Sequence, residues 1–209
     1  MKQEWRKTEK QFYLPKDKPE LITISKFKFY TIEGKGNPND DFFTQYIEVL
    51  YALSYGVKMS PKKGITPVGY YDYTVYPLEG IWDLSEDVEQ SSDGTFDKND
   101  LVFKLMIRQP DFVNADFAAQ ILEQVRKNKP NSLLEKVQFE EIEEGNFIQM
   151  LHLGSYDNEP ESFKIMEEFA ETNGYRRKSK KHKEIYLTDA RKVTPDKLKT
   201  VLRFGVEKK

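Results

Sequence analysis

The chain of 209 residues contains no cysteine, which excludes disulfides, thiolate catalysis and cysteine-ligated metal sites. It has two histidines, so a metal site built mainly from histidine is not expected. Lys and Arg number 33 against 35 Asp and Glu, which argues against a nucleic-acid binder because such proteins usually carry a basic excess. Residues 1–18 lack the apolar core of a signal peptide, and no run is long and apolar enough to span a membrane. We therefore expect a soluble cytoplasmic protein without a metal or cofactor.

Aromatic residues, in contrast, are plentiful, with 14 Phe, 12 Tyr and 2 Trp. A core large enough for a chain of this length accounts for most of the phenylalanines. Tyrosine suits half-buried surfaces, because its ring is apolar and its hydroxyl can stay in contact with water. The chain is long enough for one sizeable domain or two small ones.

The stretch from His182 to Thr188 carries the most distinctive pattern. On a strand, side chains alternate between two faces, so Ile185 and Leu187 point into a core. His182, Glu184 and Tyr186 then share the other face. A carboxylate flanked by aromatic groups is a plausible floor for a pocket that binds a flat or cationic ligand or protonates it.

The first part of the chain is predicted to contain an irregular lead-in at 1–20, then strands and one helix. The helix is expected to end at Gly56, because glycine favours the end of a helix. An insert at 85–144 is predicted to hold an acidic loop, a strand and a second helix. The predicted elements are strands 21–32, 68–76, 80–84 and 101–108, helices 42–55 and 115–127, and the loop 85–99.

The last part of the chain repeats the order of the first. It is predicted to contain a strand at 147–153, a helix at 161–172 and paired strands at 175–179 and 182–188. A shift of 118 residues places Gly56 on Gly174 and preserves the order of elements. We predict an α+β fold in a single domain, 1–209, made of two βαββ halves related by a pseudo-twofold axis.

The two halves are assigned to residues 20–84 and 145–203. If they pair edge to edge, one antiparallel sheet forms, with the helices on one face and an open ligand groove on the other. Clefts between repeats are common ligand sites.

Several motifs that together span most of residues 20–203 are characteristic of one known family. They are Pro77–Trp82, Leu105–Phe112, Ile148–Gly154, Asp157–Pro160, His182–Asp189 and Lys197–Arg203. On these residues the chain resembles the GyrI-like small-molecule-binding domains, and most closely their stand-alone branch. Two positions depart from the expected pattern: Lys183 stands between His182 and Glu184, and Ala190 stands where proline is expected.

The resemblance implies a tandem βαββ fold with a ligand groove at the pseudo-twofold axis. It also implies that some stand-alone members hydrolyse DNA-alkylating natural products by opening a strained cyclopropane ring. The partner would be a small, aromatic molecule, with no direct contact to nucleic acid or membrane. The sequence does not indicate an oligomeric state.

Glu184 and Tyr186 are the leading catalytic candidates. A carboxyl group buried beside aromatic rings has a raised pKa, which suits a general acid. The structural alternative for Glu184 is an exposed strand carboxylate paired with Lys181 or Lys183. Tyr186 would line the groove or simply cover the sheet.

Glu159 is the third catalytic candidate, with two open interpretations. Asn158 and Glu161 fit a helix capping box with Pro160 in the first turn, so Glu159 would interact favourably with the helix N-terminus. Alternatively, Glu159 is a second carboxylate that activates water opposite Glu184.

Five further residues are candidates for ligand contact. Trp82 corresponds to Tyr186 if Ile81 matches Ile185, and this aromatic pair could sandwich a planar ligand. A buried core position is the alternative for Trp82. The full set of ligand-binding candidates is Tyr71, Trp82, Met150, His152 and His182, with His152 also readable as a structural histidine.

Three functions remain open from the sequence. The first is a hydrolase that opens a cyclopropane ring by acid–base catalysis with water and so protects the cell. The second is a module that binds aromatic or cationic drugs without turnover. The third is a gyrase-inhibitor-like protein, which would need an exposed docking patch.

Overall fold

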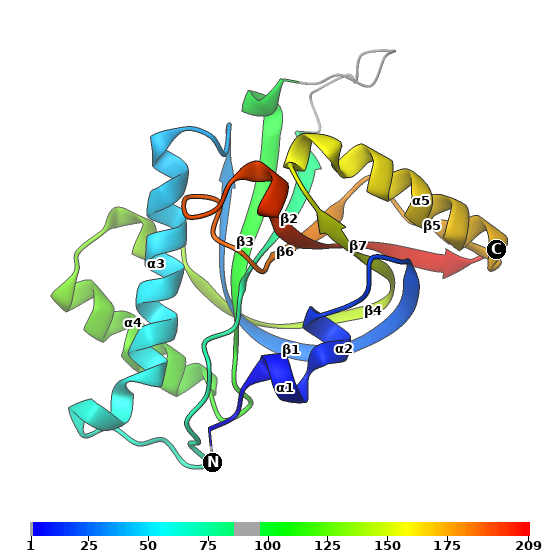
Figure 1. Cartoon of the computed structure of the whole chain (residues 1–209). Coiled ribbons are helices and arrows are strands. Elements are labelled where there is room, and N and C mark those ends of the chain that lie inside the picture. The colour runs from blue at the N-terminus through cyan, green and yellow to red at the C-terminus, as the bar shows by residue number, and fades with distance from the viewer. Residues whose placement is uncertain (1, 86–96) are drawn as a thin grey trace. The chain divides into compact units, whose positions relative to one another are not determined.

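Strand-forming runs of β-branched and aromatic residues alternate along the chain with segments of helical period, and the computed structural model has the expected α+β fold. The structure describes residues 2–85 and 97–209. Residues 86–96 of the predicted acidic loop lie outside the described residues. In chain order (Figure 1), the helices and strands are α1 (Trp5–Thr8), α2 (Lys10–Tyr13), β1 (Glu20–Lys35), α3 (Asp41–Lys58), β2 (Leu78–Leu84), β3 (Leu101–Gln109), α4 (Ala115–Asn128), β4 (Gln138–Leu153), α5 (Glu159–Thr172), β5 (Tyr175–Arg177), β6 (His182–Tyr186) and β7 (Lys199–Lys208).

One sheet contains the seven strands in the order β4-β1-β3-β2-β6-β7-β5, and β4 also pairs with β7. The pairing of β1 with β3 is antiparallel, as are the pairings of β4, β5 and β6 with β7. The prediction that 175–179 and 182–188 pair with each other is wrong. Both segments pair instead with β7, β6 with its residues Thr200–Arg203 and β5 with its residues Val206–Lys208.

The chain divides into two compact units, and β1, β2 and β4 contribute residues to both. The α3–α4 unit comprises Met1–Gln3, Phe27–Leu78 and Trp82–Ile142. The α5 unit comprises Glu4–Lys26, Glu79–Ile81 and Glu143–Lys209. The division of the chain into the halves 20–84 and 145–203 stays a prediction.

In the α3–α4 unit, the predicted helices are confirmed and lie side by side (Figure 1). The prediction that Gly56 ends the first helix is wrong, because α3 continues to Lys58. A Cβ atom at position 56 would lie only 2.8 Å from Ile121 Cγ2 of α4. Glycine is therefore present for the close approach of the two helices, and not for a helix end.

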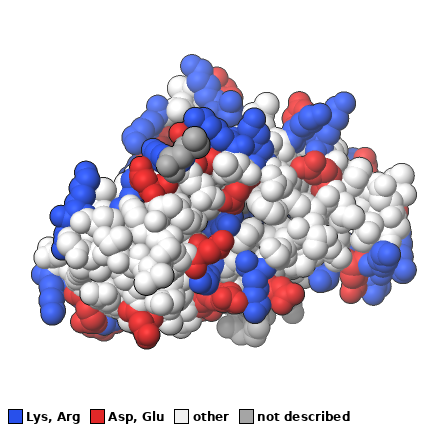
Figure 2. Space-filling model, turned by 90° about the horizontal axis from the view of Figure 1, so that it is seen from below, with Lys and Arg blue, Asp and Glu red and all other residues white. Residues whose placement is uncertain are grey.

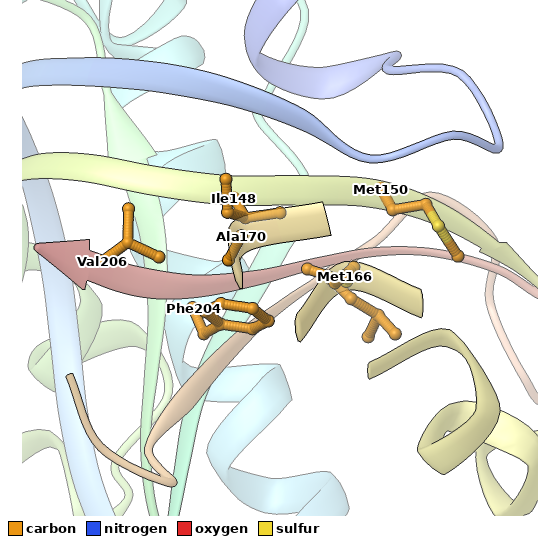
Figure 3. Packing of buried hydrophobic residues seen from close by; sticks show 7 residues of the cluster. Ile148, Met150, Met166, Ala170, Phe204 and Val206 are labelled. Carbon is orange, nitrogen blue, oxygen red and sulfur yellow. The ribbon is translucent and has the colours of Figure 1, made fainter. Parts of the chain in front are cut away.

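In the α5 unit, an apolar cluster joins α5 to the sheet (Figure 3). Met166 and Ala170 lie four residues apart on α5, so they share one face of the helix. The cluster consists of Ile148 and Met150 from β4, Leu202, Phe204 and Val206 from β7, and Met166 and Ala170 from α5.

The N-terminal segment covers the opposite face of β4 and β7. Gln149 and Arg203 alternate with the cluster residues, so they point away from α5. Arg203 Nε donates to Gln149 Oε1 at 2.9 Å, and its guanidinium also donates to the Phe12 carbonyl. Trp5 and Tyr13 are buried in α1 and α2. The prediction of an irregular lead-in is therefore wrong over these two short helices.

The predicted strand at 68–76 is also wrong, since only Tyr73 within it forms an isolated bridge, to Gln3. Gly69 has a φ of 79°, which breaks an extended run at its start. Three of its tyrosines, Tyr70, Tyr71 and Tyr73, pack around the Phe112 ring instead, with ring centroids 5.2, 5.2 and 6.0 Å from it.

The surface carries both signs of charge. On the face shown in Figure 2, basic and acidic side chains are interspersed, in keeping with the near balance of 33 and 35 charged residues. Among the described residues, none of the helices combines the length and the apolar character needed to cross a membrane.

Candidate functional site

Glu184 of strand β6 points toward α5. Glu184 pairs with Leu202 of β7, and directly opposed residues of an antiparallel pair point to the same face. Leu202 belongs to the apolar cluster beneath α5. Glu184 therefore lies on the face that α5 covers, whereas the ligand groove was predicted on the face away from the helices.

Helix α5 brings a second carboxyl group to this place. Glu159 is its first residue, and donor atoms of Glu159, His182 and Glu184 all lie within 4.8 Å of one another. Glu159 and Glu184 are only 6% and 8% exposed, and their side chains form a hydrogen bond with each other. Because an ionised carboxylate has no proton to donate, one of the two must be protonated.

The surroundings favour the neutral form of Glu159. Burial, the charge and hydrogen bond of Glu184 and the charge of Asp157 together raise its pKa to about 10. Its Oε1 is buried and makes no hydrogen bond within the described residues. The raised pKa favours the protonated form of Glu159 at neutral pH.

The two carboxyl groups lie close together, as the second interpretation of Glu159 requires, and the activation of water by Glu159 stays a prediction. The predicted capping box is wrong, because the Asn158 side chain makes no capping hydrogen bond. Asn158 also has a ψ of 0°, which is outside the extended region that a capping residue usually adopts.

His182 supports Glu184 from the solvent side. Its Nε2 lies 3.0 Å from Glu184 Oε1, and its ring meets Phe163 of α5 at a centroid distance of 4.8 Å. Its side chain keeps 22% of its surface exposed. The imidazole therefore lies between the carboxyl pair and water.

Two tyrosines flank the carboxyl pair. Tyr186 follows Glu184 by two residues on the same face of the chain, and its ring meets that of Tyr156 edge to face at 6.1 Å. Burial and the charges of Glu184, Glu159 and Asp189 raise the pKa of Tyr156, so its hydroxyl stays protonated. Tyr156 is not among the residues predicted from the sequence. Its position three residues before Glu159, in a tight turn, was the available signal, because residues three apart in such a turn share a side.

The opposite face of β6 carries a different charged pair. Lys183, which departs from the family pattern, donates to Glu79 Oε2 at 2.9 Å, and both side chains are 2% exposed. Glu79 and Lys183 neutralise each other inside the α5 unit. Lys183 therefore points away from the Glu159–Glu184 pair.

Trp82 and Tyr71 belong to the α3–α4 unit. Trp82 is buried against Phe43 and Phe103, at centroid distances of 5.8 and 5.5 Å. Tyr71 is half-buried beside Phe112. Contact of either residue with a ligand stays a prediction.

Met150 and His152, two further candidates, are buried in the α5 unit. Met150 packs in the apolar cluster. His152 uses both ring nitrogens, with Nδ1 2.9 Å from Ser162 Oγ and Nε2 3.0 Å from the Ser155 carbonyl oxygen. Their surroundings suit structural roles, and ligand contact by these two residues also stays a prediction.

The three donors Glu159, His182 and Glu184 are spaced closely enough to share a cation. The burial of the two neighbouring carboxyl groups also favours a proton held between them. The buried acid pair, the histidine and the two tyrosines form a site suited to binding a small molecule and transferring a proton to it.

Comparison with protein families now identifies the chain. The model of the GyrI-like small molecule binding domain matches residues 17–207, nearly the whole sequence. The chain belongs to the GyrI-like family. This confirms the resemblance inferred from the motifs. A comparison with the curated proteins finds no match.

Several solved structures are similar to this chain. A structure described as a hydrolase from Listeria innocua is similar, with 35% identity, a TM-score of 0.87 and coverage of 98% of this chain and 100% of that one. An uncharacterized conserved protein from Listeria innocua has 37% identity and the same TM-score, with the same coverage. The C-terminal domain of EcmrR, at 16% identity and a TM-score of 0.51, covers 92% of this chain and 98% of its own and is similar in fold.

Proposed function

We propose that this GyrI-like chain binds a small aromatic electrophile beside Glu159 and Glu184 and hydrolyses a strained ring, such as a cyclopropane conjugated to a carbonyl group. The observation that carries this proposal is the buried, hydrogen-bonded carboxyl pair with an aromatic pair next to it. Such a reaction would protect the cell from a DNA-alkylating compound.

Glu159 acts as the general acid in the proposed reaction. Its proton passes to the carbonyl oxygen of the ligand, and a water oxygen attacks the ring carbon. The carbon–carbon bond of the ring breaks, and its electron pair moves into the conjugated system to give an enol or phenol. Glu184 accepts the proton that the attacking water loses. Strain release lowers the intrinsic barrier, so positioning and acid–base assistance suffice.

The carboxyl pair can restore itself after each turnover. Glu159 ends the reaction as a carboxylate and Glu184 as an acid, and the hydrogen bond between them lets the proton return. The net change is the addition of one water molecule to the ligand, so no external proton donor is needed.

Tyr156 and Tyr186 support the binding part of the proposal. Tyr156 is 36% exposed, so its ring can meet a ligand as well as the edge of Tyr186. Aromatic side chains bind flat ligands through their faces and edges. The hydrolase description of the Listeria innocua structure, at 35% identity, gives independent support for turnover.

Product analysis with a panel of cyclopropane-bearing alkylators tests the proposal. The expected product is heavier than the ligand by one water molecule. Treatment with EDTA is expected to leave product formation unchanged, because the proposed steps use a proton and no metal. Tight binding without any product over hours would favour the alternative, a non-catalytic module that sequesters aromatic or cationic drugs.

A further inference from the structure

The first turn of α5 carries Glu159 but is not held by a capping side chain. Asn158, the residue before the helix, makes no side-chain hydrogen bond to the exposed backbone N–H groups of this turn. Capping side chains usually fix where a helix begins. Another contact must therefore fix Glu159 against the sheet.

His152 at the end of β4 provides such a contact. Its Nε2 is 3.0 Å from the Ser155 carbonyl oxygen, which can only accept, so Nε2 carries the hydrogen. Nδ1 forms the second hydrogen bond of the ring, at 2.9 Å from the Ser162 hydroxyl oxygen. His152 is 4% exposed, so neither bond competes with bulk water.

These two bonds hold both sides of the segment that leads into α5. Ser155 precedes the short turn Tyr156–Asn158, and Ser162 lies in the first turn of α5. Ser162 follows Glu159 by three residues, so both lie on one face of the helix, and both are buried. A shift of Ser162 would therefore move the Glu159 carboxyl group relative to Glu184.

We infer that His152 is a positioning residue, which acts through Ser162 to hold Glu159 at hydrogen-bonding distance from Glu184. Its effect on turnover rests on the proposed function, whereas its effect on the carboxyl pair does not. His152 is predicted from the sequence to be a ligand contact or a structural histidine, and its contacts with Ser155 and Ser162 connect it to the carboxyl pair.

Ser162→Ala tests the inference with little disturbance, because alanine favours helix and fits the space of serine. The turnover number is expected to fall about tenfold, with KM within about twofold, since the lost contact orients the acid and does not bind the ligand. The infrared C=O band of the protonated carboxyl, assigned by its absence in Glu159→Gln, is expected to shift. The band of the wild-type protein provides the reference.

Thr172→Ala is the matched control. The Thr172 hydroxyl donates to the Glu168 carbonyl oxygen at 2.8 Å at the far end of α5, so this variant loses a comparable hydrogen bond away from Glu159. The infrared C=O band and the turnover number of this variant are expected to match those of the wild type. His152→Asn, checked for folding by circular dichroism, should reproduce the band shift of Ser162→Ala.

Identical bands in Ser162→Ala, Thr172→Ala and wild type would overturn the inference. If the wild type forms no product, the proposed function fails, but the infrared comparison still decides whether His152 and Ser162 position the pair. The two failures are therefore distinguishable.

Discussion

Glu140 in the α3–α4 unit and Glu159 in the α5 unit are the same residue type with opposite behaviour. Partial burial raises the pKa of Glu140, but hydrogen bonds from Lys104 at 2.7 Å and Thr31 at 2.5 Å and the charge of Lys104 outweigh it, so the net change is downward. For Glu159, burial, Glu184 and Asp157 all raise the pKa. The neighbours, and not the carboxyl group itself, decide which of the two is a stable anion and which is an acid.

Strand β6 shows the same contrast on its two faces. On one face, the buried carboxylate of Glu79 is neutralised by Lys183. On the other face, Glu184 meets a second acid, Glu159. A buried carboxylate beside an opposite charge forms a structural ion pair. A buried carboxyl group beside a second carboxyl group instead favours a bound proton, which is then available for chemistry. The following predictions test this difference.

The largest expected effect is on turnover. Glu159→Gln and Glu184→Gln should each lower the rate of ring opening by about 10²- to 10⁴-fold, because glutamine keeps the size but cannot exchange a proton. Binding of the ligand by Glu184→Gln should stay within about tenfold, which is about 1.4 kcal/mol. Product analysis and equilibrium binding measure the two effects separately.

Glu161→Gln is the control for both variants, because Glu161 is exposed on the same helix. It should turn over at the wild-type rate. Wild-type turnover by Glu159→Gln would assign the acid to another group.

The next largest effect concerns the structural pair. Lys183→Met should lower the free energy of unfolding by about 3–5 kcal/mol, because it leaves the Glu79 carboxylate buried without its partner. Urea denaturation of Lys183→Met and of the double variant Lys183→Met/Glu79→Leu measures this. The double variant should recover much of the loss, and equal instability of the two variants would contradict the explanation.

The third effect is on the pH dependence of stability. The pKa of Glu159, about 10 in the folded protein, lies above its unfolded value of about 4.3. Between these values the folded state binds more protons, so Glu159 makes the free energy of unfolding decrease as pH rises. Urea denaturation from pH 5 to 9 should show Glu159→Gln gaining stability relative to the wild type with increasing pH. Parallel curves would show that Glu159 is ionised in the folded protein.

The main helices, and the shared face of His182, Glu184 and Tyr186 on β6, could be predicted from the sequence because they depend on local periodicity. The sequence did not predict that Lys183 pairs with Glu79, because this contact joins strands 104 residues apart in the chain. It left the role of Glu159 open for the same reason: the raised pKa depends on Glu184, which a different element supplies.

The prediction for the N-terminal segment was wrong for another reason. α1 and α2 have four residues each, which is too short for a periodic signal. They exist because Trp5 and Tyr13 are buried and because the backbone of Phe12 accepts from Arg203. Tertiary contacts therefore determine these helices, and only the folded chain reveals them.

The smallest expected effect concerns Glu140. Its lowered pKa means that its interaction with Lys104 contributes stability above the unfolded pKa and loses it as pH falls. Because its side chain is 30% exposed, Glu140→Gln should cost only about 0.5–1 kcal/mol at pH 7 and less at pH 3. Glu33→Gln is a matched control, since Glu33 contacts the same Lys104 at 3.3 Å but is 73% exposed. Its substitution should therefore lower the free energy of unfolding by less than Glu140→Gln does. Urea denaturation at both pH values measures this, and Glu140→Gln should leave ring opening unchanged. A cost for Glu140→Gln that grows as pH falls would reverse the assignment of Glu140 as the stable anion and remove its contrast with Glu159.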